Sequence, residues 1–157
     1  MGGGPGALAV AEIASGLRVG SLVVGHAPND GHHADEPVVL DPAAVAALEP
    51  NGVLDVLRPF LAQVDPPAIS PRAFEVALRQ HCAADFNVTL YDSVEVREVT
   101  RPPAGGEGVC EAVLSDGRSR WDLEAQALID TADYPKHLSE IVNRAAADVT
   151  AFLSASS

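Results

Sequence analysis

The start of the chain has the residue types and spacing of a phosphate-binding loop. Gly2, Gly4 and Ala7 occupy the three fixed positions of the pattern G-x-G-x-x-G/A. In such a loop the first glycine makes a tight turn and the second lets the backbone approach a pyrophosphate. The third position must be small so that a helix and a strand can pack. The full run is Gly2-Gly3-Gly4-Pro5-Gly6-Ala7. The pattern indicates nucleotide binding, and a glycine-rich tail before an ordinary helix is the alternative.

A second group of residues has the chemistry of metal ligands. His26, Asp30, His32, His33 and Asp35 lie within ten positions of one another. Imidazole and carboxylate bind zinc, nickel or copper. However, no helical i,i+4 spacing orders these residues and no cysteine accompanies them. We therefore interpret the segment as a solvated loop and predict no metal site there.

Two further histidines fall on predicted helices. His81 and His137 are interpreted as surface or half-buried helix residues. His81 precedes Cys82, but neighbouring positions on a helix point to different faces. The pair is therefore not predicted to form a catalytic dyad.

Helices and strands alternate along the chain that must position these groups. Hydrophobic periodicity, proline and glycine stops, and β-branched runs mark the elements. Helices are predicted over residues 7–15, 42–49, 54–64, 72–84 and 136–153. Strands are predicted over residues 19–24, 87–91, 94–99, 109–114, 121–123 and 125–130. Residues 25–37 form a polar loop and residues 101–108 a turn region.

Composition restricts the class of protein. The 157 residues are 47% hydrophobic, which is consistent with a single globular domain over residues 1–157. The formal net charge of −12 disfavours nucleic acid and anionic membrane surfaces as partners. No apolar stretch has the length of a membrane-spanning helix. Cys82 and Cys110 are isolated in sequence, so we expect buried, reduced cysteines and a cytoplasmic protein.

The order of these parts resembles the nucleotide-binding domain of FAD-dependent oxidoreductases of the glutathione-reductase type. That family has a glycine-rich loop, a helix and a strand, then a helix, a strand–hairpin segment and a strand ending in an acidic motif. The corresponding stretches here are the run 2–7, the helix from Pro71, the strand 88–94, the hairpin at 114–118 and the terminal run 128–133. The resemblance implies a Rossmann-like α/β fold with a mostly parallel sheet, helices and an antiparallel β-hairpin insert.

The resemblance also implies a cofactor and the residues that would contact it. The backbone of Gly2, Gly3, Gly4, Pro5, Gly6 and Ala7 would hold the pyrophosphate of FAD. The main chain at Val94 would meet the adenine, and Thr131, Ala132 and Asp133 would pass near the pyrophosphate or ribitol. No catalytic residue is implied.

The chain departs from the family at three places. Gly25 follows the predicted strand 19–24 where the family has an acid for the ribose. Ala132 stands where the family has glycine. The family's first strand, which would precede Met1, and its substrate domain have no counterpart. We therefore expect a gap in the sheet, filled by a partner chain or a second copy, by rearrangement, or by residues upstream of Met1.

Two functions are consistent with these observations. The first is the nucleotide-binding portion of a partial or split FAD-dependent oxidoreductase, which would act on an unidentified small molecule with a partner chain. The second is a non-catalytic, degenerate Rossmann-like scaffold or interaction subunit. We expect the isolated chain to retain no stoichiometric FAD.

Overall fold

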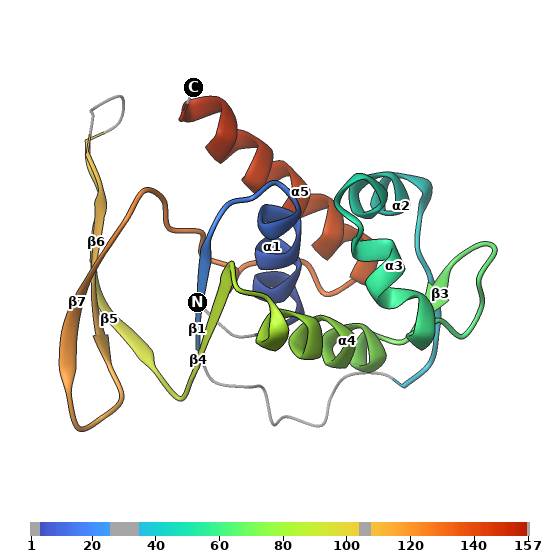
Figure 1. Ribbon diagram of the computed structural model, residues 1–157, viewed down its shortest axis with the longest axis horizontal. Coiled ribbons are helices and arrows are strands. Elements are labelled where there is room, and N and C mark those ends of the chain that lie inside the picture. Colours follow the sequence, from blue (N-terminus) through green and yellow to red (C-terminus); the bar gives the residue numbers. More distant parts are fainter. Residues whose placement is uncertain (1–3, 26–34, 104–107, 157) are drawn as a thin grey trace.

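The computed structural model describes residues 4–25, 35–103 and 108–156. In Figure 1 β1 and β4 lie between the helices and an outer sheet of strands, while the short strand β3 lies on the far side of the helices. The loop histidines predicted at 26, 32 and 33, and Gly2 and Gly3 of the glycine-rich run, lie outside the described residues.

The middle layer is a pair of parallel strands. β1 (Ser21–Gly25) pairs with β4 (Val88–Asp92), in a register that places Gly25 beside Asp92. The side chains of β1 alternate between its two faces, as the pleat of a strand requires. Val23 joins the core formed with the helices, whereas Leu22 and Val24 pack toward the outer sheet.

The outer layer is an antiparallel sheet in the order β5–β6–β7. Its strands are β5 (Glu95–Thr100), β6 (Cys110–Ser115) and β7 (Arg120–Ala125). The predicted tight turn joins β6 to β7, with Gly117 at φ +87°. Oδ1 of Asp116 accepts hydrogen bonds from the backbone N–H groups of Arg118 and Ser119. This hairpin confirms the prediction for residues 109–123.

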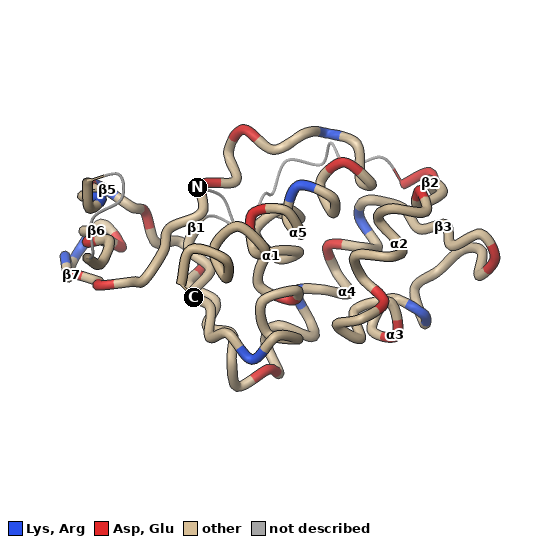
Figure 2. Tube along the Cα trace, turned by 90° about the horizontal axis from the view of Figure 1, so that it is seen from above, with Lys and Arg blue, Asp and Glu red and all other residues tan. Residues whose placement is uncertain are grey.

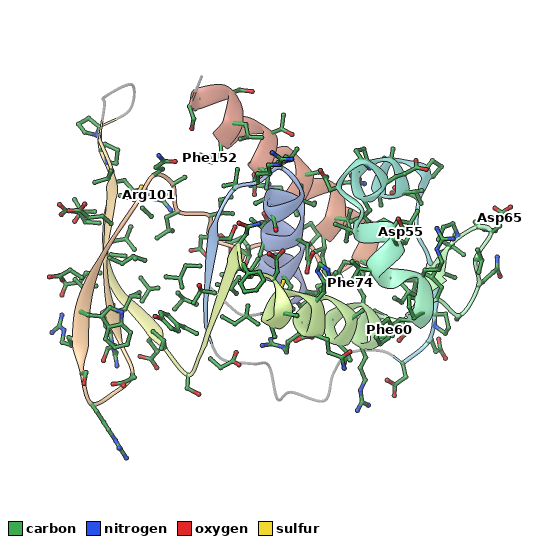
Figure 3. The ribbon with its side chains drawn as sticks, in the orientation of Figure 1. Asp55, Phe60, Asp65, Phe74, Arg101 and Phe152 are labelled. Carbon is green, nitrogen blue, oxygen red and sulfur yellow. The ribbon has the colours of Figure 1, made fainter. Side chains whose placement is uncertain are left out.

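Helices form the third layer. α1 (Pro5–Gly16) packs against α4 (Pro71–Ala84) and α5 (Leu138–Ala155). Two of the helices begin at side-chain caps, because Asp41 accepts from Ala44 N–H and Ser70 from Ala73 N–H. The aromatic ring of Phe74 is fully buried among these helices (Figure 3).

Shorter elements connect β1 to α4. These are β2 (Val38–Val39), α2 (Pro42–Leu48), the 3-10 helix η1 (Glu49–Asn51), α3 (Val53–Leu57), the 3-10 helix η2 (Arg58–Phe60) and β3 (Ala68–Ile69). β2 and β3 pair antiparallel. The helix predicted over 54–64 was wrong beyond Phe60. Pro59 lies within η2, and its missing N–H interrupts the α-helical hydrogen bonds there.

The predicted mostly parallel sheet is wrong. Among the described residues, β1 and β4 form the single parallel pair, and the other sheets are antiparallel. The strand predicted over 125–130 also fails: β7 ends at Ala125, and the segment that follows has no ladder partner. The fold is therefore a small mixed α/β arrangement.

Charge is spread over the whole molecule. In Figure 2 the acidic positions occur on the helical layer and on the outer strands alike, with few basic positions between them. No helix in the described ranges is both long enough and apolar enough to cross a membrane.

Candidate functional site

The first candidate region is the amino-terminal end of α1. Gly4 is the N-cap, with no side-chain cap, and Pro5 is the first helical residue. Leu8 N–H is the first to bond within the helix, to Gly4 O. The N–H groups of Gly6 and Ala7 therefore lie before the first backbone hydrogen bond of the helix, as expected at a helix start. A Cβ atom at Gly4 would have no heavy atom within 4 Å, so a ligand has room to approach this backbone.

The segment after β7 passes the same end of α1. Tyr134 places its ring over Gly6 and donates a 2.6 Å hydrogen bond from its hydroxyl to Oδ2 of Asp148 on α5. Burial raises the pKa of Tyr134, and the hydrogen bond to Asp148 raises it further. The guanidinium of Arg144 lies 5.9 Å from the centre of the same ring. The structure thus brings Tyr134, which follows the predicted cofactor residues 131–133, against Gly6 of the glycine-rich run.

The other predicted cofactor residues lie in different settings. Ala132 and Asp133 are exposed, and Ala132 N–H donates to Oδ1 of Asp130. Val94 is buried in the small core beneath the outer sheet, together with Ala112 and Leu114. Its side chain therefore has a structural role.

An apolar cavity of about 580 Å³ opens beside β1. β1 lines one side, and residues 125–129 and Thr131 line another. Val10 and Ala14 of α1 and Phe152 of α5 contribute from the helical layer, and Leu114 from the outer sheet. Phe152 is labelled near the end of α5 in Figure 3. The cavity therefore lies within the middle layer, between two apolar faces.

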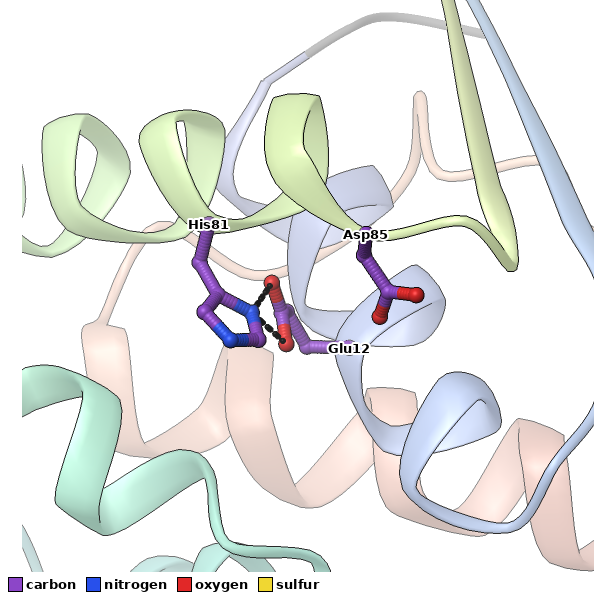
Figure 4. A group of neighbouring side chains, drawn as sticks. All are labelled: Glu12, His81 and Asp85. Atoms are coloured by element: carbon purple, nitrogen blue, oxygen red, sulfur yellow. Dashed lines mark hydrogen bonds and ion pairs between the residues drawn. The ribbon is translucent and has the colours of Figure 1, made fainter.

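A polar cluster lies at the opposite end of α1 (Figure 4). Glu12 on α1 has a side chain that is 3% exposed. Nδ1 of His81 on α4 lies 2.8 Å and 3.0 Å from its two carboxylate oxygens. Asp85, the residue after α4, has a ligand oxygen within 4.8 Å of those of the other two residues. Glu12 thus shares one site with two residues from the end of α4 that are distant from it in sequence.

The surroundings of this cluster set its protonation. Asp85 accepts a short hydrogen bond from the Ser15 hydroxyl, and this bond holds the Asp85 pKa below its usual value. The thiol of Cys82 donates to Oε1 of Glu12 at 3.1 Å. Burial raises the Cys82 pKa, and the contact with Glu12 adds to this effect. Cys82 is therefore a neutral thiol, which is a poor nucleophile.

The sequence interpretation missed this cluster. His81 is half-exposed, as predicted, but both it and Cys82 contact Glu12, although adjacent helix positions point in different directions. Both can do so because the Glu12 carboxylate lies between them. The sequence feature that could have indicated this cluster is Glu12, a single acidic residue inside the apolar run of residues 7–14. Both Cys82 and Cys110 are buried and free, as predicted.

Comparisons with known proteins match the fold and not the sequence. No family model matches the chain, and no curated protein matches it. Among solved structures, p-nitrophenol 4-monooxygenase from Pseudomonas putida is similar over 80% of this chain and 37% of its own, with 18% identity and a TM-score of 0.58. The Diels-Alderase of pyrroindomycin biosynthesis is similar over 79% of this chain and 29% of its own, with 19% identity and a TM-score of 0.54.

These likenesses show the fold alone. The chain spans little more than a third of the monooxygenase and less than a third of the Diels-Alderase. Both neighbours are enzymes by name, and the fold is shared with part of each. This fold match does not show a relation to the glutathione-reductase type of oxidoreductase.

Proposed function

We propose that the chain is the nucleotide-binding portion of an FAD-dependent oxidoreductase, with a partner chain supplying the substrate contacts. The observation that carries the proposal is the open space beside the backbone of Gly4 at the start of α1, followed by β1 in parallel with β4. The named chemistry of one structural neighbour, a monooxygenation, requires an oxygen-activating cofactor, and flavin is one of these.

The residues at this edge of the molecule suit a dinucleotide. Ligands of parallel α/β sheets bind outside the carboxyl ends of the strands, near the helix start. Gly25 and Asp92 end β1 and β4 side by side. Gly25 has no side chain, but the exposed carboxylate of Asp92 lies in register with it and hydrogen-bonds Arg79. Asp92 would accept hydrogen bonds from the ribose hydroxyls.

Within this proposal the chain binds and orients, and FAD supplies the redox chemistry when bound. The backbone at Gly4, Gly6 and Ala7 would hold the pyrophosphate against the positive end of α1. Thr131 would lie along the same side, since it lines the cavity behind α1.

Equilibrium titration of FAD, followed by flavin fluorescence, tests the proposal. The wild-type chain should bind FAD, and Gly4→Val should abolish binding because its side chain occupies the space left for the pyrophosphate. Asp92→Asn should weaken binding by about tenfold to a hundredfold, the cost of one charge-assisted hydrogen bond. Gly20→Ala is the matched control, since its Cβ would meet only Asn87 O at 3.8 Å. Equal affinity in Gly4→Val and the wild type would reject the site.

The cavity beside β1 supports a second proposal, in which the chain is an interaction subunit that binds a partner chain. Among the described residues β1 pairs with β4 alone, and the cavity lies along β1 between apolar side chains of both neighbouring layers. A strand buried on both faces needs such surroundings and is apolar along its whole length. We infer that an apolar strand from a partner chain completes the sheet here.

Fusion of a Val/Ile-rich strand ahead of the glycine-rich run tests this second proposal. The fused strand should raise the melting temperature, because it buries apolar side chains and satisfies backbone groups of β1. A control fusion of the same length, in which two of the residues are replaced by proline, cannot form the backbone hydrogen bonds of a strand and should have no effect. Equal melting temperatures for the two fusions would contradict the proposal.

A further inference from the structure

We propose that Glu12, His81 and Asp85 form a binding site for a divalent transition-metal ion, for which zinc is the best-suited candidate. The site is separate from the nucleotide edge, because it lies near the last turns of α1 and α4 and not at the start of α1. Its ligand atoms all lie within 4.8 Å of one another (Figure 4).

The donor set suits zinc. One imidazole nitrogen and two carboxylates are ligands that zinc accepts at about 2.0–2.2 Å, with water in a fourth position. Two such ligands at a tetrahedral angle lie about 3.4 Å apart. Nδ1 of His81 already lies 2.8 Å and 3.0 Å from the oxygens of Glu12. A shift of a few tenths of an ångström would therefore admit an ion between His81 and Glu12. The Asp85 side chain, whose oxygen lies within 4.8 Å of the other two ligand atoms, would turn toward the ion to complete the set.

The electrostatics favour a cation. Glu12 and Asp85 place two carboxylates against one imidazole, and Asp85 accepts a hydrogen bond from the Ser15 hydroxyl. The carboxyl ends of α1 and α4 add the negative ends of two helix dipoles. α1 has no basic residue in its last turn to offset this field.

The surroundings combine rigidity with access. Glu12 is almost fully buried and is oriented by the Cys82 thiol, while Asp85 is oriented by Ser15. Hydrogen bonds of this kind fix the ligands of metal centres. The His81 side chain is 46% exposed, so an ion can enter from solvent and retain a water molecule. A bound ion would link α1 to α4.

Competition between the protein and a chromophoric zinc chelator tests the site. The background is a triple variant in which His26, His32 and His33 are alanine, since these histidines could bind zinc independently. This background should bind one equivalent of Zn²⁺. The melting temperature should rise by about 5–10 °C at a free zinc concentration one hundred times the Kd.

Variants in the cluster decide the assignment. In that background His81→Gln should weaken zinc binding by about a hundredfold or more, because a ligand is lost. His137→Gln, which changes an exposed histidine at the start of α5, should leave the affinity unchanged. Substitution by Co²⁺ should give the intense visible absorption of a tetrahedral site, and His81→Gln should remove it.

Asp85→Asn is the second variant, because its partly exposed side chain can change without disturbing the core. It should also weaken binding, and circular dichroism should report an unchanged fold. The absence of zinc binding in the triple variant would overturn the proposal. So would an affinity that neither His81→Gln nor Asp85→Asn lowers.

Discussion

The ring of Tyr134 lies so close to Gly6 that a Cβ atom at position 6 would fall 2.7 Å from Cδ2 of the ring. This contact joins the segment after β7 to the start of α1. The ring cannot easily move away, since its hydroxyl is hydrogen-bonded to Asp148. The close packing of the Tyr134 ring on α1 explains why position 6 is a glycine.

Gly6→Ala should therefore destabilise the protein despite the better helix propensity of alanine. We expect a loss of about 1–2 kcal/mol in the free energy of unfolding, measured by urea denaturation. Gly20→Ala is the control, because its Cβ meets only Asn87 O at an ordinary 3.8 Å. If the two variants are equally stable, the Tyr134 contact does not constrain position 6.

A stricter constraint is expected at Gly16, where α1 ends. A Cβ atom there would lie 2.9 Å from Asn51 O and 3.0 Å from Asn51 Cα. Backbone atoms cannot rotate aside as a side chain can, so Gly16→Ala should cost about 3 kcal/mol. Gly20→Ala, which has an ordinary 3.8 Å contact, should leave the midpoint of urea unfolding unchanged or raise it. A Gly16→Ala protein as stable as Gly20→Ala would contradict this close approach.

The Tyr134 hydroxyl should make stability depend on alkaline pH. Burial, together with the Asp148 hydrogen bond, raises its pKa above the value of about 10 in an unfolded chain. The folded state then keeps a proton that the unfolded state loses, so this contribution is complete below pH 10 and is lost at higher pH. Tyr134→Phe should cost about 1 kcal/mol at pH 7. Its deficit relative to the wild type should shrink above pH 10 in chemical denaturation, and a constant deficit would argue against the raised pKa.

The opposite dependence is expected for Ser15 and Asp85. The Ser15 hydrogen bond lowers the pKa of Asp85 below that of an unfolded chain. This stabilisation is present above a pH of about 3.9 and is lost as the pH falls through the lower folded value. Ser15→Ala should thus be less stable than the wild type at pH 7, and the difference should shrink as the pH falls below about 3.9. A difference that persists unchanged at pH 2 would mean that Ser15 acts by packing alone.

The elements with local signals were predictable from the sequence. The turn at Asp116 and Gly117 and the helix starts at Pro42 and Pro71 each depend on residues within four positions. The strand expected over residues 125–130 would depend instead on a neighbouring strand to which its backbone could hydrogen-bond. The described part of the chain provides none beside residues 126–130, and an apolar pattern alone cannot create a strand.

The candidate site was predictable to a similar extent. The glycine spacing predicted a loop followed by a helix from residue 7, whereas α1 begins at Pro5 with Gly4 as its N-cap. The cluster of Glu12 and His81 joins residues 69 positions apart, and no local spacing encodes that distance. It follows from the packing of α1 on α4, which only the tertiary structure reveals.

The position of α1 has a consequence for how the chain folds. This helix is buried on the sides that meet α4 and α5, yet residues 17–137 separate it from α5. During synthesis an apolar helix would leave the ribosome long before its last partner. Contacts between such distant segments slow folding and leave apolar surface open to aggregation meanwhile. The nascent chain should therefore depend on chaperones until residues 138–155 have emerged.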